Sequence, residues 1–131
     1  MAENEPGKEN KEKQLDKKGY RAEVVSAHSE RIDHYVNEWL DVHPNIDVNE
    51  MTLSESGKQI DVAFLYRETE PVENKYHAIV ISAQYGGSIN NYVNKWLGAN
   101  PNIDIERMAM GSSNKQIDII FLYKEKGPEI K

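Results

Sequence analysis

Four aspartates are the first residues whose type and spacing suggest chemistry. Asp47, Asp61, Asp104 and Asp118 recur as matched pairs along the chain. Paired carboxylates can act as acid and base when their surroundings separate their pKa values. Each of the four also stands in a stretch of alternating apolar and polar residues, which is typical of a strand with one wet face. We therefore interpret them as outward-facing strand residues and not as a catalytic pair.

Histidines and acidic residues do not form the pattern of a metal site. Glu30 and His34 are four residues apart and could share one face of a helix. The corresponding positions later in the chain are Gly87 and Asn91, and a metal ion needs three or four converging ligands. The chain contains no cysteine, which excludes thiolate ligands and disulfides. The sequence predicts neither a metal nor another cofactor.

Nucleophilic catalysis is also unsupported. Ser26 and Ser82 follow β-branched residues, but no Gly-x-Ser-x-Gly motif surrounds them and no histidine recurs at a spacing that would activate both. Residues 84–88 precede a predicted helix, where backbone amides can hold phosphate. Their sequence matches no phosphate-loop fingerprint, so we interpret them as a turn. We expect the chain not to be an enzyme.

Six polar residues recur at equivalent positions and are the first choice for a binding site. They also have structural interpretations, because a lysine near a hairpin discourages edge pairing of strands and an asparagine beside an apolar helix stripe can bond a neighbouring segment. The predicted binding residues are Asn37, Lys58, Gln59, Asn94, Lys115 and Gln116.

These matched pairs result from an internal duplication. Tyr35-Val-Asn-Glu-Trp-Leu40 matches Tyr92-Val-Asn-Lys-Trp-Leu97, and Lys58-Gln-Ile-Asp61 recurs as Lys115-Gln-Ile-Asp118. Of the 49 positions from Tyr20 to Glu68, 25 are identical in the second copy. Chance does not produce such agreement, so the chain holds two copies of one structural unit.

Each copy is predicted to fold as strand, helix, strand, strand. In the first copy, residues 22–27 are rich in strand formers, and residues 32–40 carry one apolar stripe at helical spacing. The apolar phase slips between Val48 and Met51, which predicts a β-bulge. Residues 60–66 alternate cleanly as a last strand.

The expected architecture is an α+β fold, built as a tandem duplication of a β-α-β-β module. We expect the helices to pack on one face of a mainly antiparallel sheet and the repeats to be related by a pseudo-twofold axis, because a unit of about 50 residues buries too little surface alone. The expected parts are a disordered charged arm at 1–18, a first repeat at 19–69, a linker at 70–75, a second repeat at 76–126 and a frayed tail at 127–131.

Composition and charge narrow the classes of partner. There is no run of about 18 apolar residues, so no membrane partner is expected. The formal net charge is −6; residues 20–74 carry 12 acids and 4 bases, whereas residues 75–131 carry 5 acids and 7 bases. A basic footprint for nucleic acid is therefore missing. The lack of cysteine and of an apolar secretory signal leads us to expect a cytoplasmic location.

Apolar residues are also predicted on the sheet face opposite the helices. This set is too apolar for a wet face, so we expect the other repeat, a protein partner or self-association to cover it. The predicted function is a non-enzymatic protein-binding or assembly module. The alternatives are an acidic inhibitor or decoy of a basic protein, of the kind a phage or mobile element encodes, and a small-ligand-binding module with its site between the repeats. The predicted second-face residues are Val25, Met51, Leu53, Ala63, Leu65, Ile79, Ile81, Met108, Met110, Ile120 and Leu122.

The pattern of each copy resembles a known family. In the second copy, a strand at 80–82, a helix at 89–97, an Ile-Asp strand at 103–108 and a last strand at 117–125 containing Phe-Leu-Tyr-Lys-Glu look like the small sporulation-associated proteins of Bacilli, which are single β-α-β-β units. The duplication and the arm depart from that family, and the resemblance implies no catalytic residues. The element order is also similar to that of dodecin-type flavin-binding modules, but the residues expected to stack a flavin are not recognisable.

Overall fold

The computed structural model describes residues 19–84, 87–113 and 115–126. The arm predicted at 1–18 and the tail predicted at 127–131 lie outside the described residues. The described elements confirm the α+β class and the duplicated β-α-β-β order. Their bounds, in chain order, are β1 (Arg21–His28), α2 (Ile32–Asp41), β2 (Ile46–Ser56), β3 (Gln59–Glu68), β4 (Tyr76–Gln84), α3 (Ile89–Ala99), β5 (Ile103–Ser113) and β6 (Gln116–Glu125).

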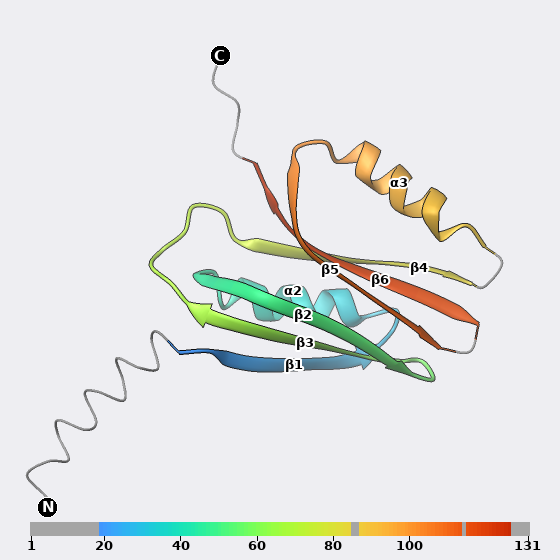
Figure 1. Ribbon diagram of the computed structural model, residues 1–131, viewed down its shortest axis with the longest axis horizontal. Coiled ribbons are helices and arrows are strands. Elements are labelled where there is room, and N and C mark those ends of the chain that lie inside the picture. Colours follow the sequence, from blue (N-terminus) through green and yellow to red (C-terminus); the bar gives the residue numbers. More distant parts are fainter. Residues whose placement is uncertain (1–18, 85–86, 114, 127–131) are drawn as a thin grey trace, which may run out of the picture.

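Each repeat forms its own three-stranded antiparallel sheet, with its last strand in the middle (Figure 1). The first sheet has the order β1-β3-β2 and the second has the order β4-β6-β5. Both predicted bulges are present, because the register shifts between Val48 and Glu50 in β2 and between Ile105 and Arg107 in β5. The two repeats therefore share even their irregularity.

The helices pack on one face of their own sheets through matching tryptophans. Trp39 of α2 stacks on Phe64 of β3, with 5.2 Å between ring centroids. Trp96 of α3 stacks on Phe121 of β6 in the same way, at 5.5 Å. These rings contribute to the packing of helix on sheet, which fits their helical spacing in the sequence.

The register of the strands corrects the predicted second sheet face. Residues directly opposite each other in antiparallel strands point to the same side. Met51 lies opposite Phe64, and both Val25 and Leu53 lie opposite Val62, so these three residues share the helix side of the first sheet. The bulge in β2 causes part of this difference, because it returns Met51 and Leu53 to the helix side.

The same correction holds in the second sheet. Seven of the eleven predicted second-face residues therefore lie on a helix side: Val25, Met51, Leu53, Ile79, Ile81, Met108 and Met110. The prediction was correct for the other four, which lie on the faces away from the helices: Ala63, Leu65, Ile120 and Leu122.

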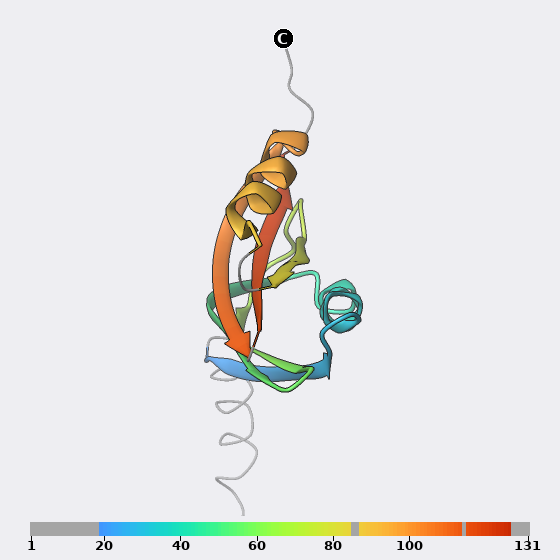
Figure 2. The same ribbon diagram turned by 90° about the vertical axis from the view of Figure 1, so that its right-hand side faces the viewer.

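A single core joins the two repeats. Ile32 and Val36 of α2 are fully buried and belong to one cluster with Ala78, Ile120 and Leu122 of the second sheet. The helix α2 packs against both β1 and β4, and β2 lies along β5. Figure 2 shows α2 beside the two sheets, with α3 at the far end of the molecule. The face of the second sheet that is turned away from α3, here called its far face, thus packs on α2 and β2.

The contact between the repeats is head-to-tail. The first repeat presents its helix side, and the second presents the side turned away from α3. Equivalent strands β2 and β5 are neighbours, as in a twofold pair, but a true twofold contact would use the same surface twice. Three residues of α2 are buried, whereas the description of α3 includes no buried residue. The two ends of the molecule are therefore left with different uncovered surfaces.

Candidate functional site

The six predicted binding residues do not converge on one site. The side chain of Asn37 bonds both backbone groups of Ala78 on the edge of β4. Its amide nitrogen donates to the Ala78 carbonyl at 2.9 Å, and its carbonyl oxygen accepts from the Ala78 amide at 2.8 Å. Asn37 therefore joins the helix of one repeat to the sheet of the other.

Asn94 is the equivalent residue of α3, and it is exposed. The same geometry would require a strand edge beside α3, in the position that β4 takes beside α2. Lys58 and Lys115 are also exposed, at the hairpin ends of β3 and β6. These three residues are available to a partner but do not lie in one cluster with Asn37.

Gln59 and Gln116 each belong to a repeated polar cluster on the sheet face away from the helix. In the first repeat, Ser26 and Gln59 donate hydrogen bonds to Asp61. The second repeat has the same arrangement, in which Ser82 and Gln116 donate to Asp118. Each serine hydroxyl is engaged as a donor to a carboxylate, which differs from a serine activated by a histidine base.

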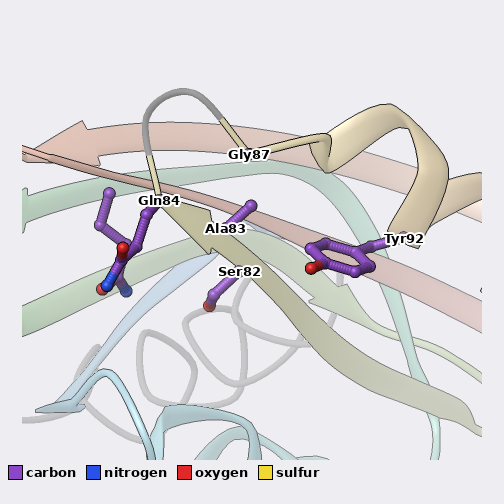
Figure 3. A pocket seen from close by; sticks show the side chains of 6 residues that line it. Ser82, Ala83, Gln84, Gly87 and Tyr92 are labelled. Atoms are coloured by element: carbon purple, nitrogen blue, oxygen red, sulfur yellow. The ribbon is translucent and has the colours of Figure 1, made fainter.

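One hollow lies beside this second cluster (Figure 3). It has a volume of about 520 Å³ and is lined by Ser82, Ala83, Gln84, Gly87, Tyr92 and Gln116. Another hollow, lined by residues of β1 and α2, belongs to the first repeat. Each of these two hollows lies within a single repeat, whereas the ligand site considered from the sequence was expected between the repeats.

Asp118 also meets a carboxyl group of the other repeat. Asp118 is fully buried, and Glu55 of β2 lies beside it with its Oε2 shielded from solvent. Burial raises the pKa of Glu55 from its usual 4.5 to about 8, and the hydrogen bond with Asp118 and the negative charge of Asp118 add to this rise. The outward-facing position predicted for Asp118 was wrong, because α2 and β2 of the first repeat cover the face of the second sheet on which Asp118 lies.

The raised pKa of Glu55 makes stability depend on pH. Because the folded chain holds a proton that the unfolded chain releases above about pH 4.5, the contribution of this group is greatest below that pH and declines as the pH rises toward 8. We expect Glu55→Gln to flatten this decline and to make the protein more stable than the unsubstituted chain at pH 8.5. Urea unfolding at pH 5 and pH 8.5 measures the difference.

The matched control is Glu50→Gln, because Glu50 lies on the same strand and is exposed. This variant should keep the pH dependence of the unsubstituted chain. Equal pH profiles for Glu55→Gln and the unsubstituted chain would contradict the assignment.

Metal ligation finds no support in the part of the chain that the structure describes. No group of three or more histidine, aspartate or glutamate side chains there is arranged to hold a metal ion. His34 contacts Glu38 at 3.3 Å, and both side chains are more than half exposed. Glu30 lies before α2 begins at Ile32, so Glu30 and His34 do not share the helix face that the sequence suggested.

Among the described residues, six of the nine exposed large apolar side chains lie on two surfaces at opposite ends of the molecule, and the other three are Tyr35, Val42 and Tyr92. The first, here called the β1–β3 face, lies on the first sheet away from α2. Val24 is 60% exposed and Leu65 is 37% exposed. Tyr20 is 58% exposed and lies under the Arg67 guanidinium of the same face. The β1–β3 face consists of Tyr20, Ala22, Val24, Ala63 and Leu65.

The second surface, here called the β5–α3 face, lies on the helix side of the second sheet. Met108 and Met110 are 61% and 62% exposed, and Ile105 is 41% exposed. Asn94 of α3 is also exposed, and we include it in this face because it is the equivalent of Asn37, which lies at the contact between the repeats. The apolar residues were visible in the sequence, but which of them stay uncovered depends on how the repeats stack.

Comparison of the chain with family models, with curated proteins and with solved structures finds no match. No helix within residues 19–84, 87–113 and 115–126 is long and apolar enough to cross a membrane.

Proposed function

We propose that the chain is a non-enzymatic protein-binding or assembly module built from two related α+β repeats. The observation that carries the proposal is the grouping of exposed apolar side chains on the β1–β3 face and the β5–α3 face. Single exposed apolar residues are common on protein surfaces, but a contiguous group is typical of an interaction site. Both faces lie on strands of packed sheets, so a partner meets a surface that is already formed.

The repeated polar clusters support this proposal over catalysis. Asp118 is fully buried and its carboxylate already accepts hydrogen bonds from Ser82 and Gln116. A buried carboxylate with these partners stabilises the packing of strands and does not meet a substrate. This supports a structural role for Asp118 in the second repeat.

The proposal is tested with a variant that changes only the β5–α3 face. Met108→Lys places a charge in the apolar surface, where burial by a partner would be costly. We expect this bait to lose the proteins that the unsubstituted chain captures from its source cells, as measured by affinity capture and mass spectrometry. The folded state should be retained, because Met108 is 61% exposed.

The control bait is Glu73→Gln, which changes the net charge by the same amount at an exposed position between the repeats. It should capture the same proteins as the unsubstituted chain. The proposal fails if all three baits capture the same set, or if the unsubstituted chain captures nothing that exceeds a bare resin.

The charge of the first repeat favours a second candidate function, an acidic inhibitor or decoy of a basic protein. Residues 20–74 carry 12 acids and 4 bases. Binding of a basic protein through these charges would weaken steeply with salt, because exposed charges are screened. Capture through the apolar faces would persist at high salt, so washing the same resin with low and high salt separates the two functions.

A further inference from the structure

The two repeats contact each other through an interface inside the chain. Its surfaces come from the helix side of the first repeat and from the far side of the second. Because the repeats are equivalent, the chain also carries one more copy of each surface. The unused copies are the β5–α3 face and the β1–β3 face.

The burial of equivalent residues shows this relation on the far sides of the two sheets. Tyr76, Ala78 and Leu122 of the second sheet are 4%, 5% and 0% exposed in contact with the first repeat. The first sheet has a tyrosine, an alanine and a leucine at the equivalent positions, and all three are exposed. These are Tyr20, Ala22 and Leu65.

The helix sides show the same relation in reverse. Val48 and Met51 of the first repeat are 2% and 7% exposed because the second sheet covers them. Their equivalents Ile105 and Met108 are 41% and 61% exposed. The apolar surface that receives a sheet in one repeat is thus present and uncovered in the other.

The polar contacts made by Tyr76 and Asn37 across the internal interface are also available a second time. The Val48 amide donates to the Tyr76 hydroxyl at 3.1 Å, and Asn37 bonds both backbone groups of Ala78. The side chains that make these bonds are conserved in the other repeat, as Tyr20 and Asn94. Ala22 stands opposite Leu65 in β1 as Ala78 stands opposite Leu122 in β4, so its backbone groups occupy the same place on a sheet edge.

We propose that the β1–β3 face of one copy of this chain docks on the β5–α3 face of a second copy, with Asn94 bonding the backbone of Ala22. This inference rests on the proposed function, since it names the partner that the two faces bind. The helix α3 would cover the β1 edge of the next copy as α2 covers the β4 edge within the chain. Covering an exposed strand edge is itself a common requirement of sheet proteins.

Charge favours this pairing of unlike repeats. Residues 20–74 have a formal charge of −8 (12 acids, 4 bases) and residues 75–131 have a formal charge of +2 (5 acids, 7 bases). Docking a first repeat on a second repeat brings opposite charges together, whereas docking two first repeats does not. The carboxyl pair of Glu55 and Asp118 would not recur between chains, because Ser112 stands at the position equivalent to Glu55.

Two positions require adjustment between chains. Within the chain, Gly111 lies so close to Leu53 that a side chain at position 111 would collide with it. Between chains, the position equivalent to Gly111 is occupied by Ser54, which has a side chain. The residue equivalent to Leu53 is Met110, whose unbranched side chain can turn aside. Arg107 donates to the Asn49 carbonyl at 2.9 Å, and its equivalent Glu50 cannot make that bond. The contact between chains is therefore expected to be weaker than the contact within the chain.

Mixing two singly blocked variants of the full chain tests the head-to-tail contact. Val24→Lys blocks the β1–β3 face, and Met108→Lys blocks the β5–α3 face; both residues are more than half exposed, so each variant should fold. We expect the unsubstituted chain to form species larger than 15.0 kDa in sedimentation velocity, and each variant alone to be a monomer. An equal mixture should form a one-to-one pair and nothing larger, because only one intact contact is left.

The unsubstituted chain forms a closed ring or an open chain according to whether the rotation between copies closes. A mass that stops at a fixed multiple shows the ring, and a mass that rises with concentration shows the chain; both support the proposal. A monomer at every concentration would overturn it, and so would a variant that pairs with itself. If self-association is absent but Met108→Lys still loses captured proteins, the proposed function stands and only the identity of the partner is wrong.

Discussion

Leu122→Ala is expected to lower the free energy of unfolding by about 2–5 kcal/mol, the usual cost of emptying a fully buried leucine site. Leu122 is 0% exposed in the core that joins the repeats. Leu65 is the same residue at the equivalent position of the first repeat, and it is 37% exposed. We expect Leu65→Ala to cost about 1 kcal/mol or less in the dilute monomer, because a partly exposed side chain loses less contact. Urea unfolding at low protein concentration measures both values.

This pair of variants isolates the effect of stacking from the effect of sequence. The two leucines lie on the central strands β6 and β3, each opposite an alanine of the neighbouring edge strand. A fold in which both repeats were covered alike would give equal losses. Equal losses would therefore contradict the head-to-tail arrangement.

The sequence was sufficient to predict the repeat unit. The identical spacing of Trp39 and Trp96 predicted a helix packed on a sheet, and the slip after Val48 predicted the bulge. These features depend on local periodicity and on neighbours within one repeat. Because the duplication repeats these local patterns, both copies of the sequence predict the same elements.

The relation between the repeats could not be obtained in this way. Asp61 and Asp118 both follow the sequence Lys-Gln-Ile, yet Asp118 is fully buried and Asp61 is only partly buried. The difference arises because each side of a sheet finds a different neighbour at the two ends of a head-to-tail pair. A pattern that is the same in both copies carries no information about which copy is covered.

The predicted binding residues show the same division. Asn37 and Asn94 were predicted as binding residues because of their recurrence in both repeats. Recurrence did not indicate that Asn37 would be used within the chain while Asn94 is left exposed. The exposed apolar faces were not predicted, because Met108 and Met110 were expected on the side of the sheet away from the helix.

Asn37→Ala is expected to destabilise the fold by about 2–4 kcal/mol, because two backbone groups of Ala78 lose their partners and each unsatisfied buried group costs about 1–3 kcal/mol.

Asn94→Ala should leave the stability of the monomer within about 0.5 kcal/mol of the unsubstituted chain, since Asn94 is exposed. The same Asn94→Ala variant should raise the dissociation constant for self-association about tenfold or more, which corresponds to about 1.4 kcal/mol. Unfolding at low concentration and sedimentation at high concentration measure the two effects separately. An Asn94→Ala chain that associates as tightly as the unsubstituted one would show that the asparagine acts within the chain only, and Lys95→Ala on the same exposed helix controls for loss of a polar side chain alone.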